Sequence, residues 1–213
     1  MQTLDLPRRR LALALAALAG FVDAAGYLSA DQYFVSFMSG NTTRLGVELA
    51  RRPVAALIPA MLALCFVLGV IGGAVLAAQA QGSHKPRLLA AVAMLLAVAA
   101  ALGGEAWPLA ALAVLAAAMG ALNNSFQREG QVSVGLTYMT GALVRMGQGL
   151  AARALGRDGA GWHQWLALWL ALACGATLGA VAQLHMAQAA FWLASIFAGL
   201  LALVARTLGT ART

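Results

Sequence analysis

Runs of about 20 consecutive apolar residues constrain this chain more than any other feature of its sequence. A helix of that length crosses the hydrocarbon core of a bilayer. Hydrophobic residues make up 62% of the 213 residues and charged residues only 10%, which is more apolar surface than a soluble domain of this length could bury. The sequence therefore predicts a polytopic integral membrane protein. The runs cover residues 11–28, 54–78, 88–103, 108–122, 165–181 and 187–204.

The runs are rich in alanine and leucine and lack the alternation of polar and apolar residues that marks the strands of a transmembrane barrel. Since helices and closed barrels are the two structures that satisfy backbone hydrogen bonds in lipid, we expect an all-α membrane helix bundle. The arginines at 8–10 and the run after them imitate a secretory signal. We interpret this run as a retained crossing, because an internal repeat includes its Gly20 and Asp23.

The net charge of +7 would suggest a nucleic-acid partner in a soluble protein. Here the basic residues gather at the ends of the apolar runs, which is typical of topology signals and of contacts with lipid headgroups. We therefore expect the lipid bilayer as a partner, no nucleic acid, and a cytoplasmic N-terminus. The basic residues at run ends include Arg8, Arg9, Arg10, Arg51, Arg52, Lys85, Arg87, Arg153, Arg157 and Arg206.

The two halves of the chain resemble each other in their polar and glycine residues. The matched positions lie 100 residues apart near the start of each half, 101 apart in the middle and 106 apart further on, as small loop insertions would produce. We therefore expect one membrane domain over residues 1–213, with one repeat at 11–104 and a second at 107–206. The matches pair Gly20 with Gly120, Asp23 with Asn123, Ser39 with Thr140, Gly40 with Gly141, Arg44 with Arg145, Gly69 with Gly175, and Gly73 with Gly179.

A polar, glycine-broken segment follows the first crossing of each half, at residues 33–52 and 131–153. The pattern predicts an extended first part and a helical second part, with Ser39 and Thr140 among the residues that cap the helix. If these segments dip into the membrane and return, the chain has six crossings and inverted repeats. If they cross, it has eight crossings and parallel repeats. We favour six because the segment cores are polar.

Residues 20–28 (GFVDAAGYL) and 34–42 (FVSFMSGNT) stand close together in the first half. In these two motifs and in overall layout, the chain resembles the YoaK-like family of small bacterial membrane proteins, a domain of unknown function. Ser39 stands where the family is expected to have threonine. The resemblance implies a bacterial inner-membrane location and about six crossings, and it implies no established activity.

Asp23 lies a dozen residues into the first apolar run, where a carboxylate is unfavourable by about 2.5–3.5 kcal/mol on insertion scales. It should therefore face the bundle interior and have a partner, for which Arg44 and Arg145 are the candidates. Either the pair fixes helix packing, or Asp23 is a proton or cation site. Because Asn123 holds the matching position, only the first half could titrate there.

The two predicted half-helices would present exposed N–H groups and positive dipole ends, which together favour an anion. Alternatively, they are capped interfacial helices whose arginines reach the headgroups. On the first interpretation, the candidate substrate-binding residues are Asp23, Ser39, Gly40, Asn41, Thr42, Arg44, Asn123, Thr140, Gly141 and Arg145.

The pairs Gly69/Gly73 and Gly175/Gly179 have the small-xxx-small spacing that lets helix backbones approach closely, so we expect them to pack helices. No histidine or cysteine spacing indicates a metal site, and the sequence contains no catalytic motif. We therefore expect no metal, no cofactor and no enzymatic activity.

Two functions remain open from the sequence. The first is a small secondary transporter or permease for a small anionic or zwitterionic solute, which requires a polar cavity at the half-helices. The second is a non-transporting membrane scaffold or partner subunit, which predicts a packed centre with direct contact between Asp23 and an arginine. Homo-oligomerisation is compatible with either function.

Overall fold

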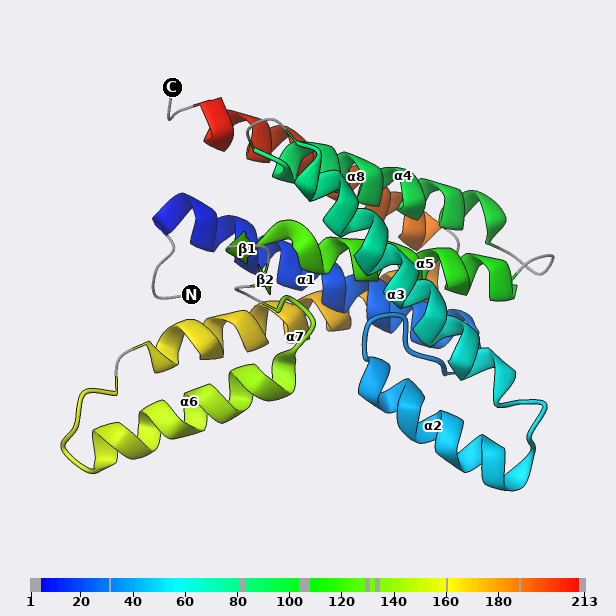
Figure 1. The fold of residues 1–213 in the computed structure, drawn as a ribbon, viewed down its shortest axis with the longest axis horizontal. Helices are drawn as coiled ribbons and strands as arrows, with labels where there is room; N and C mark the ends of the chain where they lie inside the picture. Colours follow the sequence, from blue (N-terminus) through cyan, green and yellow to red (C-terminus); the bar gives the residue numbers. More distant parts are fainter. Residues whose placement is uncertain are drawn as a thin grey trace.

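The computed structural model describes residues 5–30, 32–80, 83–103, 108–128, 131–132, 135–159, 161–187 and 189–210. Within these ranges the chain is almost entirely α-helical (Figure 1), which confirms the predicted all-α class. The elements are α1 (Leu6–Ser29), α2 (Met38–Arg51), α3 (Leu57–Ala78), α4 (Lys85–Leu102), α5 (Pro108–Leu122), η1 (Asn123–Ser125), β1 (Gln127–Arg128), β2 (Gln131–Val132), α6 (Met139–Ala154), α7 (Trp162–Met186) and α8 (Ala189–Thr210).

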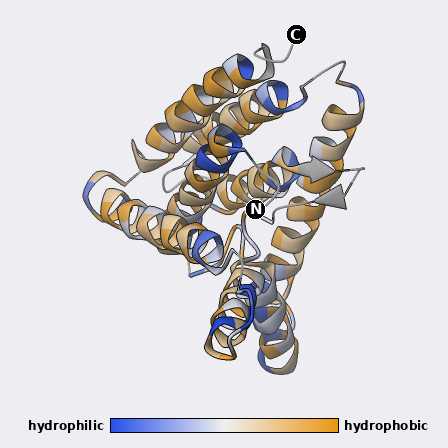
Figure 2. Ribbon diagram, turned by 90° about the vertical axis from the view of Figure 1, so that its left-hand side faces the viewer, coloured by the Kyte–Doolittle hydropathy of each residue, from blue (hydrophilic) through white to orange (hydrophobic). Residues whose placement is uncertain are grey.

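Six of the described helices are long and apolar enough to cross a membrane: α1, α3, α4, α5 with its η1 extension, α7 and α8. The other two, α2 with 14 residues and α6 with 16, are too short and too polar. By length and composition, therefore, the six-crossing prediction is confirmed over the eight-crossing alternative. Figure 2 shows apolar residues along the long helices, with hydrophilic residues gathered at helix ends.

The long helices alternate in direction through the bundle, and α2 and α6 begin near its middle and run outwards to opposite sides (Figure 1). Each short helix returns to the side from which its segment entered, so both segments are re-entrant in arrangement. Helices α1 and α5, the first of each half, run in opposite directions. This is the relation expected of inverted halves.

The extended first parts of the two segments differ in local structure. Residues 33–37 form no helix or strand, whereas Gln131 and Val132 pair with Arg128 and Gln127 in a short antiparallel ladder. Residues 133 and 134, where the sequence predicts further alternation, lie outside the described residues.

Each of the main helix pairs joins one helix of the first half to one of the second half. Helix α1 packs along α7, α5 packs along α3, and α4 packs on α8. The first long helix of each half therefore contacts the second long helix of the other half. Because α1 and α5 are covered in this way, they are the most deeply buried of the six spans. Leu15 and Leu115, at matching positions, are both fully buried in the core.

Glycines make the α1–α7 and α3–α5 contacts very close. A Cβ added to Gly20 would fall far inside 3.0 Å of the carbonyl oxygen of Leu172, and a Cβ on Gly120 would meet the carbonyl oxygen of Phe66 in the same way. Leu172 and Phe66 are themselves 106 positions apart, which is the offset of the later matches.

The paired glycines of the third and seventh helices behave alike. A Cβ on Gly69 would collide with the backbone of Ala117, and one on Gly175 with the backbone of Ala17, residues that lie 100 positions apart. Gly73 approaches the backbone of Ala121, and Gly179 that of Phe21. The same close contacts thus occur twice at the offsets of the sequence alignment. The division into repeats at 11–104 and 107–206 stays a prediction, and residues 104 and 107 lie outside the described residues.

Candidate functional site

The half-helices begin two residues earlier than the sequence suggests. Phe37 and Tyr138 occupy the N-cap positions of α2 and α6, and neither helix has a side-chain cap. The prediction that Ser39 and Thr140 cap these helices is therefore wrong, because both residues lie inside the first turn. The first N–H groups of a helix have no acceptor within its regular turns. Here the N–H groups of Met38 and Met139 donate to the carbonyl oxygens of Ser36 and Thr137, and that of Gly40 donates to Phe37. Among the described residues, the donors left at the starts of α2 and α6 are the N–H groups of Ser39, Thr140 and Gly141.

A cavity of about 430 Å³ lies where the two half-helices begin. The two segments line it at matching positions, each contributing a hydroxyl residue, an aromatic residue, a methionine and a second hydroxyl residue. Helix α3 completes the wall with apolar side chains. The lining residues are Ser36, Phe37, Met38, Ser39, Ala63, Phe66, Val67, Thr137, Tyr138, Met139, Thr140 and Gly141.

The lining of this cavity, among the described residues, carries hydroxyl groups and apolar groups but no charged side chain. The N-terminal ends of the two helices are expected to contribute positive potential there, each equivalent to about half a unit charge. Phe37 and Tyr138 are both more than 40% exposed, so aromatic rings stand at the opening. Such a site suits a small group with one negative charge attached to a weakly polar body.

Asp23 of α1 does not line the cavity but binds the backbone of a residue that does. One of its carboxylate oxygens, Oδ1, accepts hydrogen bonds from the backbone N–H groups of Val35 and Ser36, each at 2.8 Å. Since Ser36 lines the cavity, Asp23 fixes the position of the chain that leads into α2. This carboxylate therefore finds its partners in backbone N–H groups.

Neither predicted arginine forms a salt bridge with Asp23 in the described part of the chain, so the prediction of an Asp–Arg pair is wrong. The guanidinium of Arg44 lies 3.8 Å from the ring centroid of Tyr33 and donates a hydrogen bond to the carbonyl oxygen of Gln32. The guanidinium of Arg145 lies 4.7 Å from the ring centroid of Trp165. Both arginines thus stack on aromatic rings instead of contributing charge to the cavity lining.

Asn123, the counterpart of Asp23, acts on the other wall. Its Oδ1 accepts a hydrogen bond from the hydroxyl of Thr137 at 3.2 Å, and its Nδ2 donates to the carbonyl oxygen of Met119 at 3.0 Å. Thr137 corresponds to Ser36 in the first half. A polar residue of the first long helix therefore holds the same point of the cavity wall in both halves, through a carboxylate in one and an amide in the other.

The remaining candidates serve the local fold. Asn41 is fully buried and bonds to Phe34 in both directions, accepting from its N–H at 3.2 Å and donating to its carbonyl oxygen at 2.6 Å. The hydroxyl of Thr42 donates to the carbonyl oxygen of Met38 within α2. Gly40 faces the ring of Phe37, which leaves no room for a Cβ, whereas the space around Gly141 is open.

Of the ten predicted site residues, then, Ser39, Thr140 and Gly141 line the cavity, and Asp23 and Asn123 hold its walls. Sequence reasoning missed the hydroxyl and aromatic residues before the helices. A signal for them exists, because residues 36–38 (SFM) align with residues 137–139 (TYM) at the same offset of 101.

Comparison with known proteins gives a family and no activity. A protein-family profile described as "Protein of unknown function (DUF1275)" matches residues 11–204. The chain is 39% identical over 192 residues to the "UPF0700 transmembrane protein RA0705" of Rhizobium meliloti (strain 1021), and the match covers 90% of this chain and 83% of the relative. No solved structure matches the chain. With six apolar spans and a profile match over nearly its whole length, this multi-pass membrane protein belongs to the DUF1275 family.

Proposed function

We propose that this protein is a small secondary transporter or permease for a small anionic or zwitterionic solute. The observation that carries the proposal is the cavity at the starts of α2 and α6, with equivalent residues of both segments in its lining. In transporters built from repeats, broken helices bring such helix ends together to form the substrate site.

The chemistry of the lining narrows the solute class. The N–H groups of Ser39, Thr140 and Gly141 and the two dipole ends stabilise one negative charge, and they do so more strongly where water is scarce. Because the described lining has no cationic side chain, a solute with several negative charges would lack compensation. The site therefore favours a monoanion or the carboxylate of a zwitterion.

We further propose an inner-membrane location with a cytoplasmic N-terminus. Figure 1 shows the starts of α1 and α4 on the same side of the bundle. The end of α5 joins them, since Nε2 of His84 lies 3.2 Å from the carbonyl oxygen of Asn124. Figure 1 shows the end of α8 on this same side and the end of α2, which carries Arg51, on the other. The side richer in basic residues is expected to face the cytoplasm.

A flux assay in proteoliposomes tests the transport proposal. The panel comprises inorganic monoanions, short monocarboxylates and small neutral amino acids, and we expect at least one of these classes to move faster than through empty liposomes. Gly141→Val adds bulk to the cavity in open space and should reduce that flux. Gly147→Val is the matched control, because Gly147 also has open space around it in α6 and does not belong to the cavity lining.

Two results would contradict transport through this cavity. One is the absence of flux for every class by folded protein, which would favour the alternative of a non-transporting scaffold or partner subunit. The other is an equal effect of Gly141→Val and Gly147→Val, which would place the solute path away from the cavity. Melting temperatures of both variants in detergent establish that they remain folded.

A further inference from the structure

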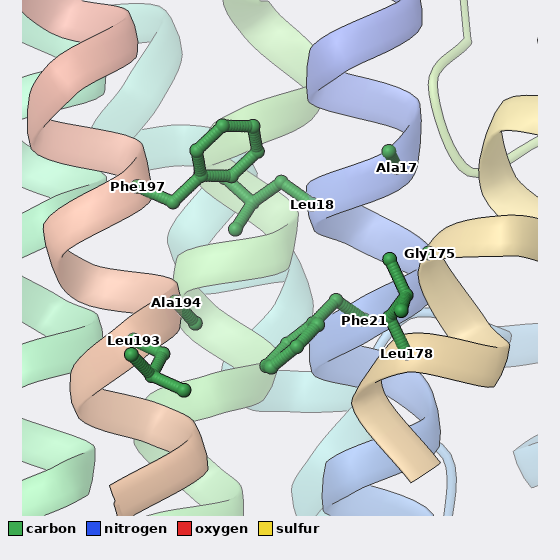
Figure 3. A pocket seen from close by; sticks show the side chains of 8 residues that line it. All are labelled: Ala17, Leu18, Phe21, Gly175, Leu178, Leu193, Ala194 and Phe197. Atoms are coloured by element: carbon green, nitrogen blue, oxygen red, sulfur yellow. The ribbon is translucent and has the colours of Figure 1, made fainter. Parts of the chain in front are cut away.

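A second cavity, of about 300 Å³, opens on the side of the bundle between α1, α7 and α8 (Figure 3). Every residue of its lining is apolar or glycine, and it is separate from the cavity at the half-helices. Leu178, Leu193 and Phe197 at its rim are between 39% and 63% exposed, so the groove faces the surroundings of the bundle. The lining residues are Ala17, Leu18, Phe21, Gly175, Leu178, Leu193, Ala194 and Phe197.

The groove arises from a difference between the two halves. Where α1 carries Leu18 and Phe21, the matching positions of α5 carry Ala118 and Ala121. The small residues are buried, and α5 packs more extensively on α4 than α1 packs on α8. Along this stretch α1 presents larger side chains to α8 than α5 presents to α4. Figure 3 shows side chains from α1 and α8 reaching into the space between these helices.

One cation stands on the same face of α1 as the groove. Arg10 precedes Ala17 by seven residues and Phe21 by eleven, so the three share one stripe of the helix. At the rise of an α-helix, Ala17 lies about 10 Å below Arg10 and Phe21 about 16 Å below it. Half the hydrocarbon core is about 15 Å thick, so the groove lies around the middle of the membrane, within reach of a lipid chain whose headgroup is at the level of Arg10. Arg10 itself is exposed.

We propose that this groove binds one acyl chain of an anionic phospholipid whose headgroup contacts Arg10. A groove without polar side chains that opens from membrane-spanning helices meets hydrocarbon, so a lipid chain is its occupant. The cation at the headgroup level selects for negative charge. The site is specific to the first half of the chain, because the matching positions of α5 are closed by alanine packing.

Native mass spectrometry of the purified protein tests this lipid site. The protein is exchanged into detergent with either phosphatidylglycerol or phosphatidylcholine of identical acyl chains. We expect one phosphatidylglycerol to be retained more strongly than phosphatidylcholine. Arg10→Gln should weaken phosphatidylglycerol binding about fivefold and bring the two lipids close together in affinity. Arg87→Gln, which removes another exposed cation from the same side of the bundle, is the matched control and should change little.

Filling the groove with a larger side chain tests whether an acyl chain occupies it. Ala17→Leu should displace both lipids, whereas Ala90→Leu, at an exposed alanine of α4 outside the groove, should leave binding unchanged. Equal lipid retention by Ala17→Leu and wild type would overturn the proposal, as would equal effects of Arg10→Gln and Arg87→Gln. A dimer that Ala17→Leu dissociates, with no lipid bound in wild type, would also overturn it by making the groove an interface between two copies.

Discussion

Gly69 and Gly72 lie three residues apart in α3 and should respond in opposite ways to the same substitution. A Cβ on Gly69 would lie well within 3.0 Å of the carbonyl oxygen of Ala117 in α5, closer than observed Cβ contacts. Backbone atoms, unlike a side chain, cannot rotate away to relieve this clash. Helices α3 and α5 would have to separate along their contact. Overpacking of this kind costs about 1–3 kcal/mol.

Gly72→Ala provides the control, because nothing lies within 4 Å of its added Cβ. Alanine is favoured over glycine within a helix by roughly 1 kcal/mol, so this variant should be as stable as wild type or slightly more stable. In a chain of this size, 1 kcal/mol shifts the melting temperature by about 2–4 °C. We therefore expect Gly69→Ala to melt roughly 3–10 °C lower than wild type in detergent.

Thermal unfolding of wild type and the two variants, in one detergent at one protein concentration, checks this reasoning. Gly175→Ala should repeat the effect of Gly69→Ala, since its Cβ meets the backbone of Ala17 in the same way. Equal melting temperatures for Gly69→Ala and Gly72→Ala would refute the view that close backbone contact holds α3 against α5.

Two further predictions concern polar groups. Asp23→Asn places in the first half the residue type found at the matching position of the second. It should lower stability by about 1–2 kcal/mol, because the N–H groups of Val35 and Ser36 lose their carboxyl acceptor. An unchanged melting temperature would contradict this role. Burial, followed by the positive charge of Lys85, lowers the pKa of His84 below its ordinary value. As pH falls, the unfolded chain therefore binds a proton at His84 before the folded chain does, so the free energy of unfolding should decrease below about pH 6.5. Melting temperatures measured from pH 8 to pH 5 should show this decrease in wild type. The part of the decrease that is due to His84 should be missing in His84→Gln.

The arrangement of crossings could be predicted from the sequence because lipid leaves few choices. Apolar length identifies the spans, and all six predicted runs correspond to long helices. The polar, glycine-broken character of residues 33–52 and 131–153 was sufficient to favour re-entrant segments over additional crossings. The alignment of residues 38–40 with residues 139–141 also located the two half-helices, whose starts share one cavity.

The partners of individual polar groups could not be predicted in the same way. Charge alone suggested Arg44 for Asp23, yet the backbone N–H groups of Val35 and Ser36 satisfy that carboxylate. These N–H groups reach Asp23 because the chain folds back after α1. Residue types alone do not reveal such a turn. The rings of Tyr33 and Trp165, on which Arg44 and Arg145 stack, are likewise brought close to these arginines by tertiary packing.

Because the helices of one half pack on those of the other, the order of synthesis affects how the bundle assembles. Helix α1 leaves the ribosome early, but α7, against which it packs, follows more than 100 residues later. At synthesis rates of about 5–20 residues per second, α1 waits several seconds or more for its neighbour. During that time the face of α1 that carries Gly20 borders lipid or an insertion factor instead of α7. A chain stopped after α5 already contains α3 and can form the α3–α5 contact, while α1 still lacks its main partner. Assembly in the membrane should therefore begin with α3 and α5 and finish when α7 packs on α1 and α8 packs on α4.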